Sequence, residues 1–174
     1  PVPDGDTGTN MNLTMESAAR EMSKEQMTTI KSVADALSMG SLMGARGNSG
    51  VILSQLFRGF CKRIANEKEV GVDVFASALQ EGVNTAYKAV IKPVEGTILT
   101  VAKNAARIAA KSAKETNDIN TLLQIVLHEA LRTLEKTPDL LPVLKQAGVV
   151  DAGGKGLCYI YEGWLSFLEG TELD

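Results

Sequence analysis

Apolar residues recur every three to four positions along most of the chain, which is the spacing expected of the buried face of a helix. The clearest example lies between residues 118 and 135, where this spacing places a set of aliphatic side chains on one stripe. The set consists of Leu122, Leu123, Val126, Leu127, Ala130, Leu131 and Leu134. Strict alternation, the mark of a half-buried strand, is absent, and only residues 70–74 and 148–150 leave room for a short strand. The pattern therefore predicts an all-α protein.

Breaks in this pattern divide the chain into eight expected helices. They cover residues 11–22, 24–39 or 26–39, 48–65, 73–91, 98–114, 118–135, 138–146 and 154–168. Ser23 is the expected N-cap of the second helix and Gly40 its end, while Thr137 caps the seventh helix and Pro138 takes its first position. Because the connections are short, we expect neighbouring helices to run antiparallel.

Four loops are rich in glycine and in small polar residues. They cover residues 3–10, 40–50, 93–97 and 148–156, so they precede the first helix and follow the second, fourth and seventh. Alternate loops of an up-and-down helical arrangement lie at the same end. We therefore expect all four loops to meet at one mouth of an antiparallel helical barrel or bundle, which makes that mouth the candidate site.

The first of these loops combines two carboxylates, Asp4 and Asp6, with Gly5 between them. In extended backbone, side chains two residues apart point the same way, and paired carboxylates repel unless a cation or a proton lies between them. Oxygen ligands of this kind suit Mg²⁺, which is usually held by one or two carboxylates together with substrate phosphates. An ordinary surface turn with Asp and Thr helix caps is the alternative reading of the same residues.

The other loops suit an anion, although each is weak evidence alone. Residues 47–50, which include Asn48, Ser49 and Gly50, offer backbone N–H groups at a helix start without side-chain bulk. Arg46 can balance phosphate charge in a transition state, or it can be a structural surface residue. Residues 96–97 and 151–154 permit close approach of a nucleotide, although glycine is also common at helix ends. Neither a Walker A loop nor a Rossmann fingerprint is present.

Composition narrows the classes of function. The chain has 174 residues, is 44% hydrophobic and carries a net charge of −3, which argues against a nucleic-acid binder. No run of about 18 apolar residues indicates a membrane span, and no signal peptide is evident. Cys61 and Cys158 are expected to be buried, reduced thiols of a cytoplasmic protein, with a disulfide between them as the alternative. His128, the single histidine, lies within a helix and is a poor candidate for a catalytic base, and the six methionines are read as core packing.

Three longer stretches, residues 1–11, 44–55 and 149–157, together resemble the nucleotide-binding domain of bacterial fatty acid kinase. That domain belongs to the Dak2 group and is similar to the ADP-binding L subunit of dihydroxyacetone kinase. The resemblance covers essentially the whole chain and implies an antiparallel eight-helix barrel with nucleotide and two Mg²⁺ ions at one mouth. It also implies that the first helix of the barrel and a further metal ligand precede Pro1. We therefore expect residues 1–174 to be one Dak2-type domain of a longer multidomain protein.

The resemblance assigns roles residue by residue. It implies that Asp4 and Asp6 bind the metal ions. It implies nucleotide contacts from Thr7, Gly8, Thr9, Asn10, Asn48, Ser49, Thr97, Asp151, Ala152 and Gly153. Together with Arg46, the two aspartates form the candidate catalytic set.

The function implied is transfer of a phosphoryl group from ATP, with ADP as product, to the carboxylate of a fatty acid. A separate fatty-acid-binding protein of the DegV-like family is the expected partner, and the product is an acyl phosphate. A carboxylate is already ionised at neutral pH, so the reaction needs no general base. Two alternatives stay open, namely the L subunit of a dihydroxyacetone kinase and a nucleotide-sensing module without turnover. The oligomeric state of the full-length protein stays open, and an oligomer is compatible with the sequence.

Overall fold

The computed structural model describes residues 6–24 and 27–170, which form eight α-helices and contain no strand. The helices are α1 (Thr7–Ser23), α2 (Ile30–Met43), α3 (Gly47–Ile64), α4 (Val72–Ala89), α5 (Ile98–Ser112), α6 (Ile119–Leu140), α7 (Pro142–Ala147) and α8 (Ala152–Glu169). The prediction of an all-α fold is confirmed. None of these helices is both long and apolar enough to cross a membrane.

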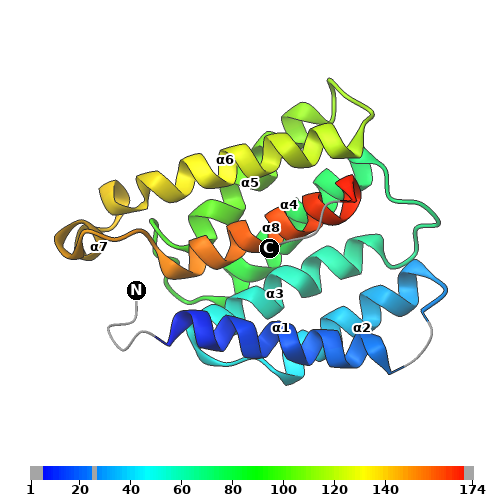
Figure 1. The fold of residues 1–174 in the computed structure, drawn as a ribbon, viewed down its shortest axis with the longest axis horizontal. Coiled ribbons are helices and arrows are strands. Elements are labelled where there is room, and N and C mark those ends of the chain that lie inside the picture. Colours follow the sequence, from blue (N-terminus) through cyan, green and yellow to red (C-terminus); the bar gives the residue numbers. More distant parts are fainter. Residues whose placement is uncertain (1–5, 25–26, 171–174) are drawn as a thin grey trace.

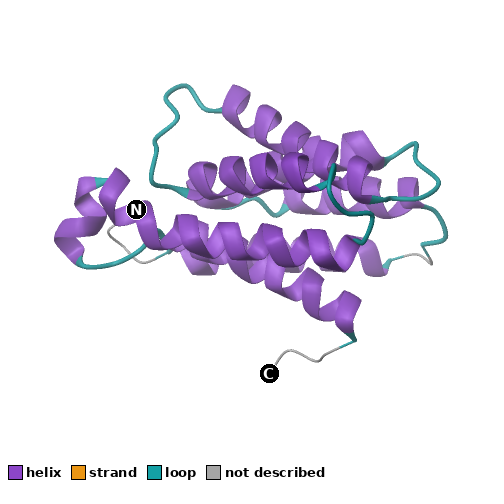
Figure 2. Ribbon diagram, turned by 90° about the horizontal axis from the view of Figure 1, so that it is seen from above, coloured by secondary structure: helices purple, strands orange, loops and turns teal. Residues whose placement is uncertain are grey.

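The long helices pack side by side in an up-and-down order (Figure 1). Consecutive helices from α1 to α6 contact one another, and α8 returns along α6, α5 and α1. This arrangement is compatible with the expected barrel. Figure 2 shows the long helices as roughly aligned rods whose connections gather at the two ends of the molecule. Residues far apart in sequence therefore meet at each end.

Helix α5 forms the centre of the core because one of its faces consists of small or aliphatic residues. Ala102, Ala105, Ala106 and Ala109 are all buried and let α4, α6 and α8 approach closely. An aromatic cluster also links α3, α4 and α8, since the Phe60 ring lies 5.6 Å from Phe75 and 5.7 Å from Trp164, measured between centroids. The core thus holds several helices in fixed relation to one another.

Glycine sets the distance between α1 and α2. A methyl group placed on Gly40 would lie 2.7 Å from the Ala18 Cα and 2.9 Å from the Ser17 carbonyl oxygen. The prediction that Gly40 ends the second helix is wrong, because α2 continues to Met43 and Gly40 is buried inside it. Glycine ends many helices, but at this position it permits two helices to cross closely.

The start of the second helix and the boundary between the sixth and seventh also differ from expectation. Helix α2 begins at Ile30, where the Thr29 hydroxyl accepts a hydrogen bond from the Ser32 N–H at 3.0 Å, and Ser23 belongs to α1. Helix α6 runs through Pro138 to Leu140, so the predicted start of α7 at Pro138 is wrong. Proline cannot donate to the carbonyl of Leu134, and the Thr137 hydroxyl donates to that oxygen instead, at 2.7 Å. Thr137 therefore lies in the last turn of α6 rather than at the start of α7.

Candidate functional site

The first residues of α1, α3, α5 and α8 lie at one end of the molecule, which we call the mouth (Figure 1). Gly153, in the first turn of α8, marks the point where three of these helices meet. A methyl group placed there would lie 3.1 Å from the Ser49 Oγ of α3, 3.3 Å from the Asp151 Oδ2 and 3.4 Å from the Ile98 Cβ of α5. The expectation that the glycine-rich loops share one end is confirmed for the described residues.

The start of α1 contributes the first part of the site. Asp6 occupies the N-cap position and is exposed, and its carboxylate makes no capping hydrogen bond to the helix. Thr7 is buried, Gly8 and Thr9 are exposed, and a methyl group on Gly8 would meet nothing within 4 Å. Asp4 lies outside the described residues, so its predicted role stays a prediction. Asp6, Gly8 and Thr9 are the accessible groups of this turn.

A strip of polar residues on α1 attaches this turn to the second loop. Thr14 is fully buried, and its hydroxyl donates to the Asn10 carbonyl at 2.9 Å or to the Gly44 carbonyl at 3.2 Å. The Ser17 hydroxyl donates to the Gly40 carbonyl at 2.6 Å. Gly47, whose φ is +65°, lies against the Asn10 side chain. The first two loops are therefore held together by direct contacts.

The second loop brings its predicted residues to the mouth but uses them differently. Arg46 is exposed at the N-cap position of α3, and Asn48 is exposed in its first turn. Ser49 is half-buried and points toward Gly153. Gly50 is buried, and a methyl group there would lie 2.7 Å from the Thr14 Oγ1. Gly50 thus serves the contact between α3 and α1, whereas Arg46 and Asn48 face solvent.

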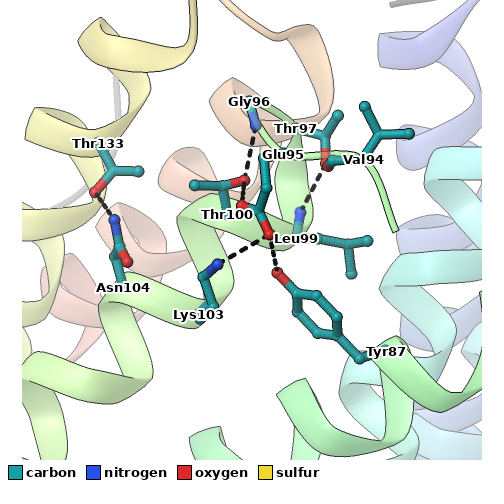
Figure 3. Close-up of polar contacts among 10 residues, drawn as sticks. All are labelled: Tyr87, Val94, Glu95, Gly96, Thr97, Leu99, Thr100, Lys103, Asn104 and Thr133. Carbon is teal, nitrogen blue, oxygen red and sulfur yellow. Dashed lines mark hydrogen bonds and ion pairs between the residues drawn. The ribbon is translucent and has the colours of Figure 1, made fainter. Parts of the chain in front are cut away.

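The third loop ends at Thr97, the N-cap residue of α5. Its hydroxyl accepts a hydrogen bond from the Leu99 N–H at 3.3 Å and donates to the Val94 carbonyl at 2.7 Å. Figure 3 shows that the neighbouring Glu95 is turned toward α5, where its carboxylate accepts from the Thr100 hydroxyl at 2.6 Å and the Lys103 ammonium at 2.9 Å. The loop at Thr97 is therefore a folded turn anchored on the helix that follows it.

Asp151 lies beneath the mouth rather than on its surface, with only 4% of the residue exposed. Its carboxylate accepts a hydrogen bond from the Gly154 N–H at 2.8 Å, and its own N–H donates to the Thr137 hydroxyl at 3.1 Å. Burial raises the pKa of this carboxyl, although hydrogen bonds from the N–H groups of Gly154 and Ile98 oppose that shift. Asp151 thereby links the N-termini of α5 and α8 to the end of α6, next to the exposed Ala152.

The electrostatic character of the mouth follows from the helix directions. Each helix start leaves N–H groups without intrahelical partners and carries roughly half a positive charge. Four such starts converge here, the exposed Arg46 and Lys155 add two full positive charges, and the exposed acid Asp6 offsets one of them. Within residues 6–24 and 27–170, no group of three His, Cys, Asp or Glu side chains is placed to hold a metal ion. The described part of the mouth therefore favours an anion such as a phosphate.

A groove of about 680 Å³ opens between α1 and α8 and begins at the mouth. Gly8 and Ala152 line the end of the groove at the mouth, and Met11, Met15 and Trp164 form an apolar wall along most of its length. A methyl group on Gly156 would lie 2.6 Å from the Met11 sulfur, so glycine lets the two helices approach. Met11 is core as predicted, whereas Met39 and Met43 are exposed, contrary to the expected packing.

Several residues that shape the mouth were not predicted. They are Thr14, Glu95, Thr100 and Thr137. The three threonines are buried, and their hydroxyl groups donate hydrogen bonds to backbone or side-chain oxygen atoms. Their one signal in the sequence is a small polar residue on an otherwise apolar helix face, at Thr14, Thr100 and Thr137. Such residues bond locally in many helices, so the signal does not identify the distant partner. His128 lies within α6, as predicted, and is exposed.

Comparison with known proteins gives consistent matches. The family model described as the DAK2 domain matches residues 1–166. The chain is 62% identical to protein YloV of Bacillus subtilis over 170 residues, which are 98% of this chain and 31% of that protein. It is 56% identical to uncharacterized proteins of Staphylococcus aureus and Staphylococcus haemolyticus over 174 residues, which are all of this chain and 32% of each relative. The chain thus spans about a third of the length of these relatives.

Proposed function

Because the chain belongs to the DAK2 domain family, a kinase-related family of nucleotide-binding domains, we propose that it supplies the ATP site of a fatty acid kinase. The observation that carries this proposal is the convergence of four helix N-termini at one mouth. Triphosphate is the most highly charged part of ATP, and helix N-termini are a common seat for phosphate groups. The mouth is therefore the natural place for the phosphates to bind.

Mg²⁺ fits the donor groups of the first turn. Asp6 is exposed at the N-cap position of α1, and the exposed Thr9 follows three residues later, so a carboxylate and a hydroxyl of the kind that Mg²⁺ binds lie at the mouth. Four positive helix ends disfavour a bare cation, so we propose that the metal enters together with the phosphates. Asp6, with Asp4, would hold it. Two bound ions would neutralise charge on the phosphates during transfer.

The residues of the chain itself act by binding and orientation. The N–H groups at the starts of α1 and α3 bind phosphate oxygens, with the exposed Asn48 and Arg46 beside them. Thr97 and Asp151 fix the starts of α5 and α8, so their N–H groups keep a set direction. The acceptor carboxylate attacks the γ-phosphorus, the bond to the β,γ-bridging oxygen breaks, and ADP leaves. Orientation and charge stabilisation supply the rate enhancement, because no proton has to be removed from the acceptor.

We propose that the acceptor arrives on a fatty-acid-binding protein of the DegV-like family. The mouth is open to solvent at Asp6, Gly8 and Asn48, so an acceptor group can reach it from outside. A long acyl chain is poorly soluble in water, and a carrier keeps it shielded until its carboxylate reaches the mouth. This proposal rests on the resemblance of residues 1–11, 44–55 and 149–157 to bacterial fatty acid kinase.

The test measures phosphotransfer by the full-length protein with labelled ATP and a fatty acid loaded on its binding protein. We expect Asp6→Asn to lower the rate by about 100-fold or more, as expected when a charge-stabilising group is lost. Asp73→Asn is the matched control, since Asp73 is an exposed acid in the first turn of α4, which starts at the opposite end. Equal activity of Asp6→Asn and wild type would refute the metal assignment.

The same assay separates the alternatives. Transfer to dihydroxyacetone but not to carrier-bound fatty acid would identify the L-subunit type of kinase. Binding of nucleotide with Mg²⁺, measured by calorimetry, without transfer to either acceptor would identify a sensing module. Nucleotide affinity that does not depend on Mg²⁺ would contradict the role of Asp6 in all three cases.

A further inference from the structure

We propose that Glu95 is a positioning residue for the nucleotide site, acting through the backbone of residues 94–97 rather than by touching the ligand. The inference rests on the proposed function, because it assumes that nucleotide binds at the mouth. It extends that function to a side chain on the outer side of the third loop, between α4 and α5 (Figure 3).

The contacts of Glu95 come from both flanking helices. One carboxylate oxygen, Oε2, accepts from the Thr100 hydroxyl at 2.6 Å, and the other, Oε1, accepts from the Lys103 ammonium at 2.9 Å and the Tyr87 hydroxyl at 3.3 Å. Tyr87 lies near the end of α4, whereas Thr100 and Lys103 belong to α5. An isolated surface ion pair contributes little, but three donors on two helices fix a carboxylate whose side chain is 45% exposed.

Thr100 passes this constraint to the backbone of the loop. Its hydroxyl donates to Glu95 and accepts a hydrogen bond from the Gly96 N–H at 2.8 Å, and Thr100 itself is buried. Gly96 has a φ of +84°, a conformation that few residues other than glycine adopt. On its other side, a methyl group on Gly96 would lie 2.7 Å from the Leu141 Cβ and 3.0 Å from the Thr137 carbonyl oxygen. The turn is thus held between the Glu95 network and the end of α6.

The direction of this turn decides where α5 begins. Thr97 follows Gly96 directly and caps α5, and the N–H of the next residue, Ile98, bonds the buried Asp151 carboxylate that caps α8. A shift of Gly96 would therefore move two of the four helix starts at the mouth. Small displacements of groups that orient a ligand have large effects on binding and rate.

The protonation states of the network are compatible with this role near neutral pH. Burial raises the pKa of Tyr87 to about 12, with a further contribution from the charge of Glu95, so its hydroxyl keeps the proton that it donates. Burial opposes ionisation of Glu95, but hydrogen bonds from Thr100, Lys103 and Tyr87 and the charge of Lys103 outweigh it and lower the pKa. The carboxylate is therefore ionised and accepts all three hydrogen bonds.

The experiment measures the dissociation constant for ATP with Mg²⁺ by calorimetry on the full-length protein, together with its melting temperature. We expect Glu95→Ala and Thr100→Val each to weaken binding by about tenfold, and Thr100→Ser, which keeps the hydroxyl, to bind like wild type. Lys103→Met should weaken binding less, because Thr100 still holds the carboxylate. The matched controls are Lys111→Met, in the last turn of α5, and Glu115→Gln, just beyond its end; both residues are exposed and their replacement should change nothing.

A double variant adds a readout that general destabilisation would not produce. If Glu95 and Thr100 act as one unit, Glu95→Ala combined with Thr100→Val should bind no more weakly than either single variant. Wild-type affinity in Glu95→Ala overturns the inference while leaving the proposed function intact. A wild type that does not bind nucleotide overturns both.

One further outcome is decisive. Loss of affinity that only accompanies loss of folded protein, and returns on cooling below the melting transition, also overturns the inference. Should Thr100→Val fail to fold, Glu95→Ala and Lys103→Met carry the test, since both side chains are partly exposed.

Discussion

Replacing Gly40 with alanine should destabilise the protein, although alanine is the better helix former. Gly40 lies inside α2 and faces α1 at their closest approach. The added methyl group would lie 2.7 Å from the Ala18 Cα, 2.8 Å from the Glu21 Cβ and 2.9 Å from the Ser17 carbonyl oxygen. Two of these atoms belong to the backbone of α1, so they cannot rotate away. The two helices would have to separate.

The magnitude follows from three opposing terms. Alanine in place of glycine within a helix favours folding by about 1 kcal/mol. Overpacking at contacts nearly 1 Å too short costs about 1–3 kcal/mol. Separation of the helices would also weaken the 2.6 Å hydrogen bond from the Ser17 hydroxyl to the Gly40 carbonyl, which contributes about 1 kcal/mol. The net loss is about 2 kcal/mol, which lowers the melting temperature by roughly 4–8 °C in a chain of this length.

Urea unfolding and thermal melting followed by circular dichroism measure this loss. Gly8→Ala is the matched comparison, since Gly8 lies in α1 and a methyl group there would meet nothing within 4 Å. Gly8→Ala should therefore keep or slightly raise the melting temperature. A Gly40→Ala variant as stable as wild type would refute the reasoning, because it would show that α1 and α2 can separate at no cost.

Two other predictions concern buried ionisable groups. Burial raises the pKa of Cys61 to about 12 and that of Cys158 to about 11, so a thiol reagent at pH 8 should label neither in the native state and both after denaturation; rapid native labelling would contradict their burial. The raised pKa of Asp151 means that the folded protein keeps a proton that the unfolded chain releases near its ordinary value of 3.8. The free energy of unfolding of wild type minus that of Asp151→Asn should thus be greatest below pH 3.8 and should fall as the pH rises through the raised pKa. A difference that does not change with pH would show that Asp151 titrates normally.

The number and type of helices could be predicted from the sequence because apolar periodicity reports burial directly. Helix ends were harder, and Thr137-Pro138 shows why. A Thr-Pro pair is a common helix start, but here the Thr137 hydroxyl bonds the carbonyl that proline leaves without a donor, so the helix continues to Leu140. The predicted helix end at Gly40 was wrong for a related reason, since glycine permits both a helix end and a close crossing of two helices. Only the neighbouring helix decides between the two.

The candidate site was predictable in its location but not in its internal bonding. Motifs around Thr7, Asn48, Thr97 and Asp151 do come to one end of the molecule. The sequence could not show that Asp151 is buried, with its carboxylate bonded to backbone N–H groups of two helices. Nor could it pair Thr14 with Gly44, which are 30 residues apart. Contacts of this kind depend on how helices pack, and no local pattern encodes them.

The position of the fourth loop needs a physical reason that strict alternation does not provide. In an up-and-down arrangement of eight long helices, the loop after the seventh would lie at the end opposite to the loops after the second and fourth. Helix α7 has only six residues, about 9 Å, and cannot cross a molecule whose other helices have 14 to 22 residues. The chain therefore stays at the mouth after α6, and α8 starts where α1, α3 and α5 start. A short helix closed by Gly148, with its φ of +68°, thus supplies the fourth positive helix end on which the proposed phosphate site depends.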